Sequence, residues 1–153
     1  MGQNHVECAR IITSSAFSMN AVIIKPKPWG REVWFAHTEH YAGKILEVTK
    51  GHRLSLQFHE KKMETQYLYK GKIKLYLGED QNSLKETMLN PGDKIDIPPR
   101  MIHRIEALEN SEIFEVSTPE LDDVIKLADD YGRMGSGNNE TVDQDLHTQH
   151  HTI

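Results

Sequence analysis

The stretch "GHRLSLQFHEKKMETQYLYKG", from Gly51 to Gly71, contains three side chains that can bind a metal ion: Gln57, His59 and Glu64. Side chains alternate across a β-strand, so Gln57 and His59 in "RLSLQFH" fall on the same face. Glu64 follows His59 by five residues, which is enough for a turn and the start of the next strand. We therefore expect the Glu64 carboxylate to return to a position beside His59.

The polar face of this strand also carries Arg53 and Ser55, and an exposed, hydrated face is the simplest alternative interpretation of the pattern. A fourth candidate ligand lies in "NPGDKIDIPPRMIHRIEA", where a turn, a strand and a rigid corner at Pro98 and Pro99 lead into a strand that begins near His103. Gln, His, Glu and His would form a mixed nitrogen and oxygen site suited to Zn²⁺, Fe²⁺, Mn²⁺, Co²⁺ or Ni²⁺.

The region from residue 22 to residue 116 is a series of short β-branched or alternating runs separated by Gly, Pro and Asn. Such spacing predicts an antiparallel sandwich or barrel. No segment between the runs has the length and 3.6-residue period of a crossover helix, so a parallel α/β sheet is disfavoured. The runs are "REVWFA", "KILEVT", "RLSLQFH", "TQYLYK", "KIKLYLG", "KIDIP", "HRIEAL" and "EIFEVS".

The character changes after Val116, where "STPELDDVIKLADDYGR" predicts a helix. Ser117 stands three residues before Glu120, which is a capping pattern, and Gly132 is a natural stop. We expect this helix to cover one end or face of the β unit through an apolar stripe at helical spacing. The stripe consists of Leu121, Val124, Ile125 and Ala128.

The two ends of the chain differ in composition from the middle. Residues 1–21 form an N-terminal extension that we expect to be loosely held, and residues 22–133 form one domain including the predicted helix. Residues 134–153 are polar and poor in large apolar side chains, which predicts a disordered tail. Its His147, His150 and His151 could capture a metal ion adventitiously.

Composition excludes several classes of partner. The 153-residue chain has 18 basic and 23 acidic residues and a formal net charge of −5, which gives no extended positive surface for nucleic acid. No apolar run approaches the roughly 18 residues of a membrane span, so we expect no membrane association. A single cysteine, Cys8, excludes an internal disulfide and is compatible with a cytoplasmic protein.

The opening stretch resembles the first cupin motif, G-x5-H-x-H-x(3,4)-E-x6-G. Gly51, His59, Glu64 and Gly71 match it in register, and Gln57 stands where the first His is usual. A Gln-x-His pair followed by Glu and a distant His resembles the zinc site of phosphomannose isomerases.

The second segment resembles the second cupin motif, G-x5-P-x-G-x2-H-x3-N. Gly92, Pro98 and His103 match, while Arg100 and Ala107 replace the usual Gly and Asn. "KPWGREVWF", "YAGKILEV" and "DDYGR" are similar to small sugar-isomerase-like cupins and to the isomerase domain of bifunctional mannose-1-phosphate guanylyltransferases. The resemblance covers residues 24 to 133. It implies an all-β cupin barrel, a double-stranded β-helix or jelly roll, which is usually a homodimer and holds its metal inside.

The resemblance implies a metal-dependent aldose–ketose isomerase for a sugar or sugar phosphate, with mannose 6-phosphate and fructose 6-phosphate as the first pair to test. The expected ion is divalent, zinc first, bound by Gln57, His59, Glu64 and His103. Two other functions stay open. One is an Fe²⁺-dependent cupin dioxygenase, and the other is a non-catalytic sugar-binding module.

The catalytic residues are less defined than the metal ligands. Glu47, Glu115 and Lys44 lie on predicted strands, and the face on which each lies depends on a one-residue register. Arg53 is on the predicted site face and could bind phosphate. Arg133 and Lys44 are also suggested by the resemblance. We select Lys44, Arg53 and Glu115 as catalytic candidates.

Overall fold

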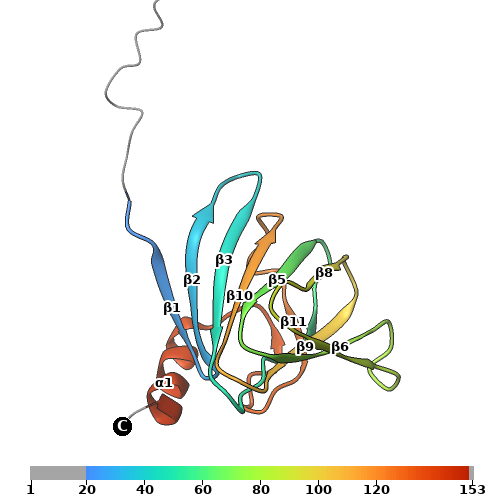
Figure 1. Ribbon diagram of the computed structural model, residues 1–153. Coiled ribbons are helices and arrows are strands. Elements are labelled where there is room, and N and C mark those ends of the chain that lie inside the picture. The colour runs from blue at the N-terminus through green and yellow to red at the C-terminus, as the bar shows by residue number, and fades with distance from the viewer. Residues whose placement is uncertain (1–19, 152–153) are drawn as a thin grey trace, which may run out of the picture.

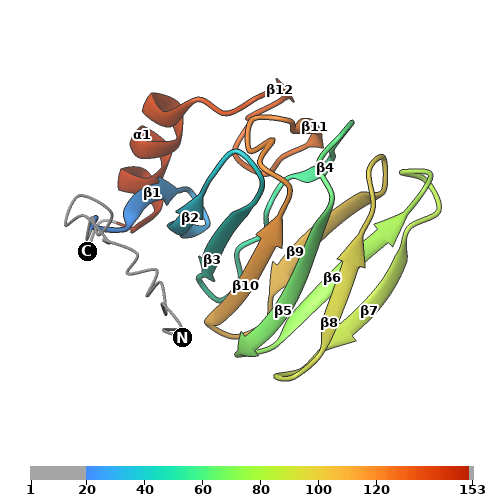
Figure 2. The same ribbon diagram turned by 90° about the horizontal axis from the view of Figure 1, so that it is seen from above.

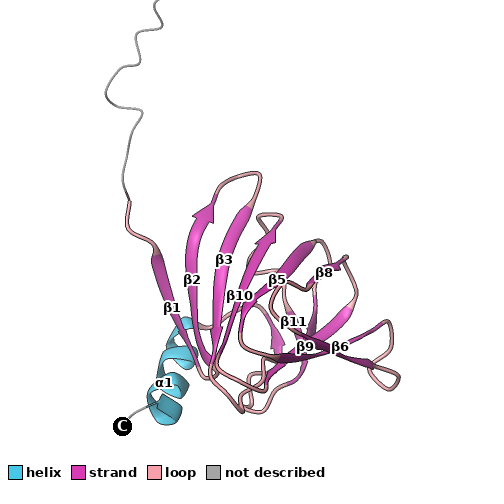
Figure 3. Cartoon of the chain, viewed as in Figure 1, coloured by secondary structure: helices cyan, strands magenta, loops and turns pink. Residues whose placement is uncertain are grey.

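The computed structural model describes residues 20–151, which form two six-stranded antiparallel sheets and one helix (Figures 1 and 3). In spatial order, the first sheet consists of β1 (Ile23–Lys27), β2 (Gly30–His37), β3 (Ala42–Val48), β10 (Ser111–Ser117), β5 (Glu64–Lys70) and β8 (Lys94–Ile97). The second consists of β12 (Gly135–Ser136), β11 (Ile125–Ala128), β4 (Leu56–Phe58), β9 (Ile102–Ala107), β6 (Ile73–Gly78) and β7 (Lys85–Leu89). The helix is α1 (Glu140–His151). The all-β prediction is confirmed, and a C-terminal helix is present, although it lies at other residues than those predicted.

All eight predicted runs contain a strand, whereas β1, β7, β11 and β12 were not predicted. The missed strands lie at the edges of the two sheets, or next to an edge in the case of β11. An edge strand has a neighbour on one side only, so its sequence needs less of the apolar alternation that identifies a central strand. In β7, for example, four of the five residues are exposed.

The two sheets face one another (Figure 2). The buried side chains between them form a polar layer and an apolar layer. Residues two positions apart on one strand both face the interior. The strand register aligns each of them with an inward-facing residue of the neighbouring strand, so the aligned residues form layers. Across β3, β10 and β5, the polar layer contains Lys44, Glu115 and Gln66, and the apolar layer contains Leu46, Ile113 and Leu68.

The apolar layer belongs to a hydrophobic core that both sheets share. Removing this apolar area from water supplies the main stabilisation of the barrel, at about 25 cal/mol per Å². The core therefore holds the polar layer in place without any ligand. Its buried members are Trp29, Leu46, Val48, Leu54, Leu68, Ile73, Leu75, Leu89, Ile105, Ala107 and Ile113.

The predicted helix over residues 117–132 is wrong. Residues 121–122 form a turn, and Ile125–Ala128 is the strand β11, which pairs with β4. The Asp123 carboxylate accepts hydrogen bonds from the backbone N–H groups of Lys61 and Lys62, at 2.6 and 2.8 Å. Leu121 and Val124 are buried beside the interior cavity. Pairing with β4 and these tertiary contacts outweigh the local helical period.

The prediction of a disordered tail over residues 134–153 is also wrong, because α1 lies within it, packed beside β1 (Figure 1). The Asn139 side chain caps the helix by accepting a hydrogen bond from the Val142 N–H at 3.2 Å. The helix docks through polar groups: buried Asp143, and His147 and His151, whose rings hydrogen-bond to backbone carbonyls of the β1 region at 2.9 Å. A composition rule that looks for apolar residues misses such a helix.

An N-terminal extension and the absence of a membrane-spanning segment were both predicted from the sequence. The predicted N-terminal extension, residues 1–21, lies outside the described residues except for Asn20 and Ala21, which precede β1. Within residues 20–151, no helix has the length and apolar character needed to cross a bilayer.

Asp143 ties α1 to the barrel, and its loss should destabilise the whole chain. Its carboxylate lies 2.6 Å from Lys27 Nζ and 3.0 Å from Arg133 Nη1, and Asp143 is 3% exposed. Asp143→Asn leaves buried Lys27 without its paired carboxylate and removes one of the two carboxylates that contact Arg133, so we expect the free energy of unfolding to fall by about 3 kcal/mol. Urea denaturation measures this change.

Glu140→Gln is the matched control, because the Glu140 side chain is 70% exposed in the same helical turn. We expect that variant to change stability by less than about 1 kcal/mol. Equal urea midpoints for the two variants would show that Asp143 does not anchor α1.

Candidate metal centre

His59, Glu64 and His103 converge in the interior from three separate segments. His59 follows β4, Glu64 begins β5, and His103 lies in β9. Their candidate ligand atoms all lie within 4.8 Å of one another. Glu64 Oε1 is 3.2 Å from His103 Nε2, and Glu64 Oε2 is 3.6 Å from His59 Nε2. All three side chains are 3% exposed or less, so this is a closed site rather than a surface cluster.

The hydrogen bonds of the two imidazoles determine which nitrogen is available to a metal. His59 Nδ1 contacts the Asp123 carbonyl oxygen, and His103 Nδ1 lies 2.9 Å from the Met101 carbonyl oxygen. A carbonyl oxygen only accepts, so each Nδ1 is the donor and each neutral ring keeps its lone pair on Nε2. Outer hydrogen bonds of this kind orient histidines that bind metals.

Both Nε2 atoms are buried and have no hydrogen-bond partner among the described residues. Buried polar atoms are nearly always satisfied, so two lone pairs directed at one carboxylate indicate a missing partner. A divalent cation would satisfy both imidazoles and share the negative charge of Glu64. These residues therefore fit a metal ion.

Gln57 lies on the same side of β4 as His59 and pairs directly with His103 of β9. Its Oε1 accepts a hydrogen bond from Ser55 Oγ at 2.6 Å, and both side chains line the interior cavity. Gln57 Oε1 is the side-chain atom that would bind a metal ion. Its role as the fourth ligand stays a prediction.

Arg100 positions the strand that carries His103. Arg100 stands where the second cupin motif has Gly, and its φ is 68°, in the left-handed region that costs an L-residue about 1–2 kcal/mol. Its N–H donates to the His59 carbonyl oxygen at 2.7 Å. The backbone therefore keeps the conformation that the motif requires although the glycine is absent, and this links the two histidine segments.

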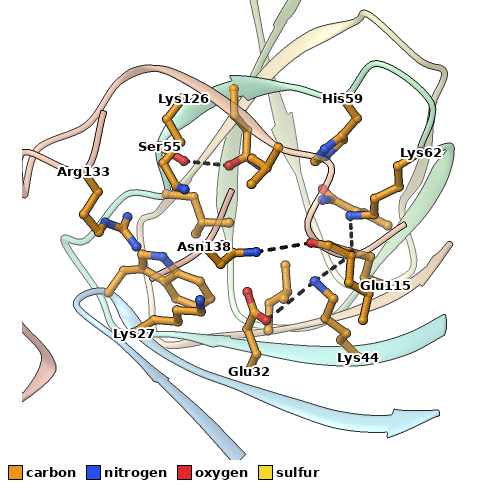
Figure 4. Close-up of a pocket in the computed structure, with 17 residues that line it drawn as sticks. Lys27, Glu32, Lys44, Ser55, His59, Lys62, Glu115, Lys126, Arg133 and Asn138 are labelled. Atoms are coloured by element: carbon orange, nitrogen blue, oxygen red, sulfur yellow. Dashed lines mark hydrogen bonds and ion pairs between the residues drawn. The ribbon is translucent and has the colours of Figure 1, made fainter. Parts of the chain in front are cut away.

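The metal centre adjoins a polar cavity of about 50 Å³, large enough for a few water molecules (Figure 4). His59 and Gln57 line one side of it. In Figure 4, Lys62, Glu115 and Lys44 continue from His59 around the cavity, and Arg133 and Lys27 lie on the opposite side.

Lys44 and Glu115, two of the predicted catalytic residues, both face the cavity and are 6% and 4% exposed. Glu115 Oε1 lies 3.4 Å from Lys44 Nζ and 2.9 Å from Lys62 Nζ. Lys62 also contacts Glu64, and Lys44 lies 3.6 Å from Glu32. The structure thus connects the metal centre to the predicted base candidates through charged contacts.

The pKa values of these groups reflect burial opposed by neighbouring charges. Burial raises the pKa of Glu32, but Lys44 and Lys27 outweigh it and lower that pKa to about 2. Burial lowers the pKa of Lys44, but Glu115 and Glu32 raise it overall. For Glu64, Lys62 and the two histidines overcome burial and hold the pKa well below its ordinary value. Glu32, Lys44 and Glu64 are therefore charged at neutral pH.

The structure does not bring Arg53 into the cavity. Its guanidinium forms two hydrogen bonds to Asp130, at 2.6 and 2.7 Å, and its side chain is 36% exposed. Leu54 and Ser55 are consecutive, lie outside regular strand and are both buried, so the predicted alternation breaks between Arg53 and Gln57. Glu47 also lies elsewhere, because it pairs with Arg31 at 2.5 Å.

Sequence reasoning missed Lys62, Glu32, Lys27 and Lys126, all of which line the cavity. Lys62 lies in the turn between His59 and Glu64, where a lysine is usually exposed, so its sequence position carries no signal. Lys27 and Lys126 lie on strands β1 and β11, which were not predicted.

Removing either histidine should strongly weaken metal binding. We expect the protein to bind one divalent ion per chain in the interior, and His59→Ala or His103→Ala to weaken binding by at least about 100-fold, because each removes one of the few ligands. Equilibrium dialysis against Zn²⁺ or Co²⁺, followed by elemental analysis, measures the stoichiometry.

His150→Ala is the control for adventitious binding, because His150 is exposed on the histidine-containing helix α1. This variant should bind the interior ion as wild type does. If His150→Ala loses the ion while His59→Ala retains it, the metal centre is misassigned.

Comparison with known proteins identifies the family. The model of the mannose-6-phosphate isomerase C-terminal family matches residues 16–129. No similar protein was found among curated sequences.

Solved structures of cupins share the fold. KdgF from Halomonas sp. is 23% identical, with a TM-score of 0.51, over 61% of this chain and 82% of KdgF. The capsular polysaccharide assembling protein CapF from Staphylococcus aureus is 19% identical, with a TM-score of 0.59, over 76% of this chain and 36% of CapF. Oxalate decarboxylase from Bacillus subtilis is 14% identical, with a TM-score of 0.60, over 75% of this chain and 34% of the enzyme.

At these identities the solved structures establish the fold alone, and this chain spans only about a third of the length of CapF and of oxalate decarboxylase. The family match covers most of the barrel, including both motif segments. From this match and the two facing sheets, we conclude that the chain belongs to the mannose-6-phosphate isomerase C-terminal family and has the cupin fold.

Proposed function

We propose that this protein is a metal-dependent aldose–ketose isomerase of a sugar or sugar phosphate, with mannose 6-phosphate and fructose 6-phosphate as the first pair to test. One observation carries the proposal: His59 of the metal-competent triad and Glu115, a buried carboxylate contacted by two lysines, line the same cavity. A metal-dependent aldose–ketose isomerase needs both a site for an ion and a nearby group that moves a proton. The family match supports the same reaction class.

Two imidazoles, a carboxylate and the amide of Gln57 form a donor set that suits Zn²⁺, the ion we assign to the site. When bound, such an ion would hold adjacent sugar oxygens and stabilise the negative charge that develops on them. His59 and His103 supply the neutral ligands through Nε2, and Glu64 supplies the anionic one.

We assign proton transfer between the two sugar carbons to Glu115. Lys44 and Lys62 both contact Glu115 Oε1, which fixes the carboxylate in one orientation and leaves Oε2 for the substrate. A buried, positioned carboxylate is a suitable base for enediol formation. Lys44 lies beside it as a fixed positive charge that can stabilise the enediolate oxygen.

Substrate entry requires part of the cavity wall to move, because about 50 Å³ is too small to enclose a hexose. We place the entrance at residues 129–138. Asn138 lines the cavity and is exposed, and Gly135 and Gly137 have φ values of 94° and 77°. β12 in this segment is only two residues long and lies at a sheet edge, so few hydrogen bonds hold it.

The second candidate function is a non-catalytic sugar-binding module. The observation that favours it is the pairing of Glu115 with two lysines, since these contacts already occupy one oxygen of the carboxylate that would have to accept a proton. A binding module would keep ligand affinity without turnover.

Hydrogen exchange at the substrate carbon tests the isomerase. In deuterated water, zinc-loaded protein should introduce deuterium at the carbon next to the carbonyl of mannose 6-phosphate or fructose 6-phosphate. Glu115→Gln should reduce kcat by about 10²- to 10⁴-fold, because it removes the proton acceptor. NMR spectroscopy of the sugar measures both the exchange and the isomerisation.

Glu112→Gln is the matched control, since Glu112 lies on the same strand β10 and pairs with Lys70 on the exposed face. It should leave kcat unchanged. Wild-type protein that introduces no deuterium into several hexoses and pentoses would exclude the isomerase, and measurable affinity for the same sugars would then favour the binding module.

A further inference from the structure

The first sheet has an outer face, on the side away from the second sheet (Figure 2). Glu115 and Gln66 point into the interior, so the residues before and after them on β10 and β5 point to this outer face. The strand register aligns these residues with apolar residues of β3, β2 and β1. One apolar row therefore crosses five neighbouring strands, and it consists of Ile24, Val33, Ile45, Phe114 and Tyr67.

Further apolar side chains widen this row into a patch. The centroids of the Tyr69 and Phe35 rings lie 5.4 and 6.4 Å from that of the Phe114 ring. Contiguous exposed apolar side chains of this kind mark a surface that another segment or molecule covers. We call the row, together with four side chains that are 46–56% exposed, the outer apolar patch. These four are Phe35, Met63, Tyr69 and Val116.

A surface hollow lies at each end of the outer apolar patch. At the end formed by β1 and β2, a hollow of about 230 Å³ is lined by residues that include Asn20 and Phe35. At the end formed by β5 and β10, a hollow of about 550 Å³ is lined by residues that include Met63 and Val116. The patch therefore offers a recess at both ends for a bulky apolar side chain.

The charges at the border of the outer apolar patch are compensated locally. On the outer face next to the row, Arg31 pairs with Glu47 at 2.5 Å, and Lys70 pairs with Glu112 at 3.1 Å. An excess of either charge would favour a partner of opposite charge. Because these charges balance, the patch favours an apolar occupant with little net charge.

The described part of the chain begins beside the outer apolar patch. Asn20, the first described residue, lines the same hollow as Phe35, so residues 1–19 are attached at one end of the patch. Neighbouring strands lie about 4.8 Å apart, so the distance from β1 to β5 across the sheet is roughly 19 Å. An extended chain advances about 3.3 Å per residue, so roughly six residues are enough to cross the patch.

The sequence before Asn20 has the character that the patch requires. Residues 9–19, "ARIITSSAFSM", contain Ile11, Ile12 and Phe17 and a single charged side chain. Phe17 stands three residues before Asn20, so it can reach the hollow at the β1 end. Ile11 and Ile12 stand nine and eight residues before Asn20, so they can reach the hollow at the β5 end.

We propose that residues 9–19 dock on the outer apolar patch of their own chain, with Phe17 in the hollow beside Phe35 and the two isoleucines in the hollow beside Met63. A segment attached next to its binding surface has an effective concentration in the millimolar range, which favours it over a separate molecule. This docking is independent of the reaction proposed for the metal centre.

Cys8 is the only cysteine of the chain, so a nitroxide spin label can be attached beside the proposed docked segment without any mutation. A nitroxide broadens the NMR resonances of nearby groups, and the full chain with ¹³C-labelled methionine methyl groups provides the resonances. Met63 lies in the outer apolar patch, whereas Met88 is exposed on β7 of the second sheet. Relative to the same sample after reduction of the nitroxide, Met63 should lose most of its intensity and Met88 should keep it.

Phe17→Asp should release the segment. It removes a buried aromatic contact, so the ratio of docked to undocked segment should fall by about tenfold or more, and the Met63 resonance should regain its intensity. Ser18→Asp is the matched control, because it adds the same charge at the next residue, whose side chain points to the other side of an extended segment. This variant should leave the Met63 resonance broadened.

A mixture of two samples distinguishes the segment of the same chain from a second copy. One sample carries the ¹³C label without the nitroxide, and the other carries the nitroxide without the ¹³C label. Met63 should keep its intensity in the mixture, and its broadening there would overturn the proposal in favour of a second copy on the patch. Equal intensities for Met63 and Met88 in the doubly labelled wild type, or a Phe17→Asp spectrum identical to that of wild type, would also overturn it.

Discussion

The compensation of the Glu64 charge inside the barrel is the constraint on which the rest of the site depends. A carboxylate that is 2% exposed is stable only if charges or hydrogen bonds replace its lost hydration. Lys62 supplies one such charge, and two imidazoles face the carboxylate. Lys62 also contacts Glu115, Glu115 lies near Lys44, and Lys44 lies near Glu32. The metal centre and the proposed base therefore belong to one connected set of charges.

A second set of charges connects the cavity to the C-terminal helix. Asp143 of α1 reaches Lys27 and Arg133, and both of these cations line the cavity. The interior is thus divided between an apolar layer, which supplies most of the stability, and a polar layer, in which each ion pair also shapes the ligand site. Removal of α1 would change the site as well as the fold.

Regular strands were predictable from the sequence because burial on one face imposes a period of two, and this period brought His59, Glu64 and His103 to the interior. The prediction failed where tertiary contacts replace local periodicity. Arg53 was wrongly predicted to face the site because the alternation of side chains breaks at Leu54. The helix predicted over residues 117–132 does not form because β11, in this segment, pairs with β4. Helix α1 was missed because polar groups dock it. Lys27 and Lys126 were missed because they lie on an edge strand and on a strand next to an edge.

The most direct test of the account is anomalous X-ray diffraction at the zinc absorption edge from crystals grown with Zn²⁺. The account predicts a peak inside the barrel, bonded to His59 Nε2, His103 Nε2 and a Glu64 carboxylate oxygen at about 2.0–2.2 Å. Peaks confined to the histidines of α1, with no density between His59 and His103, would contradict it.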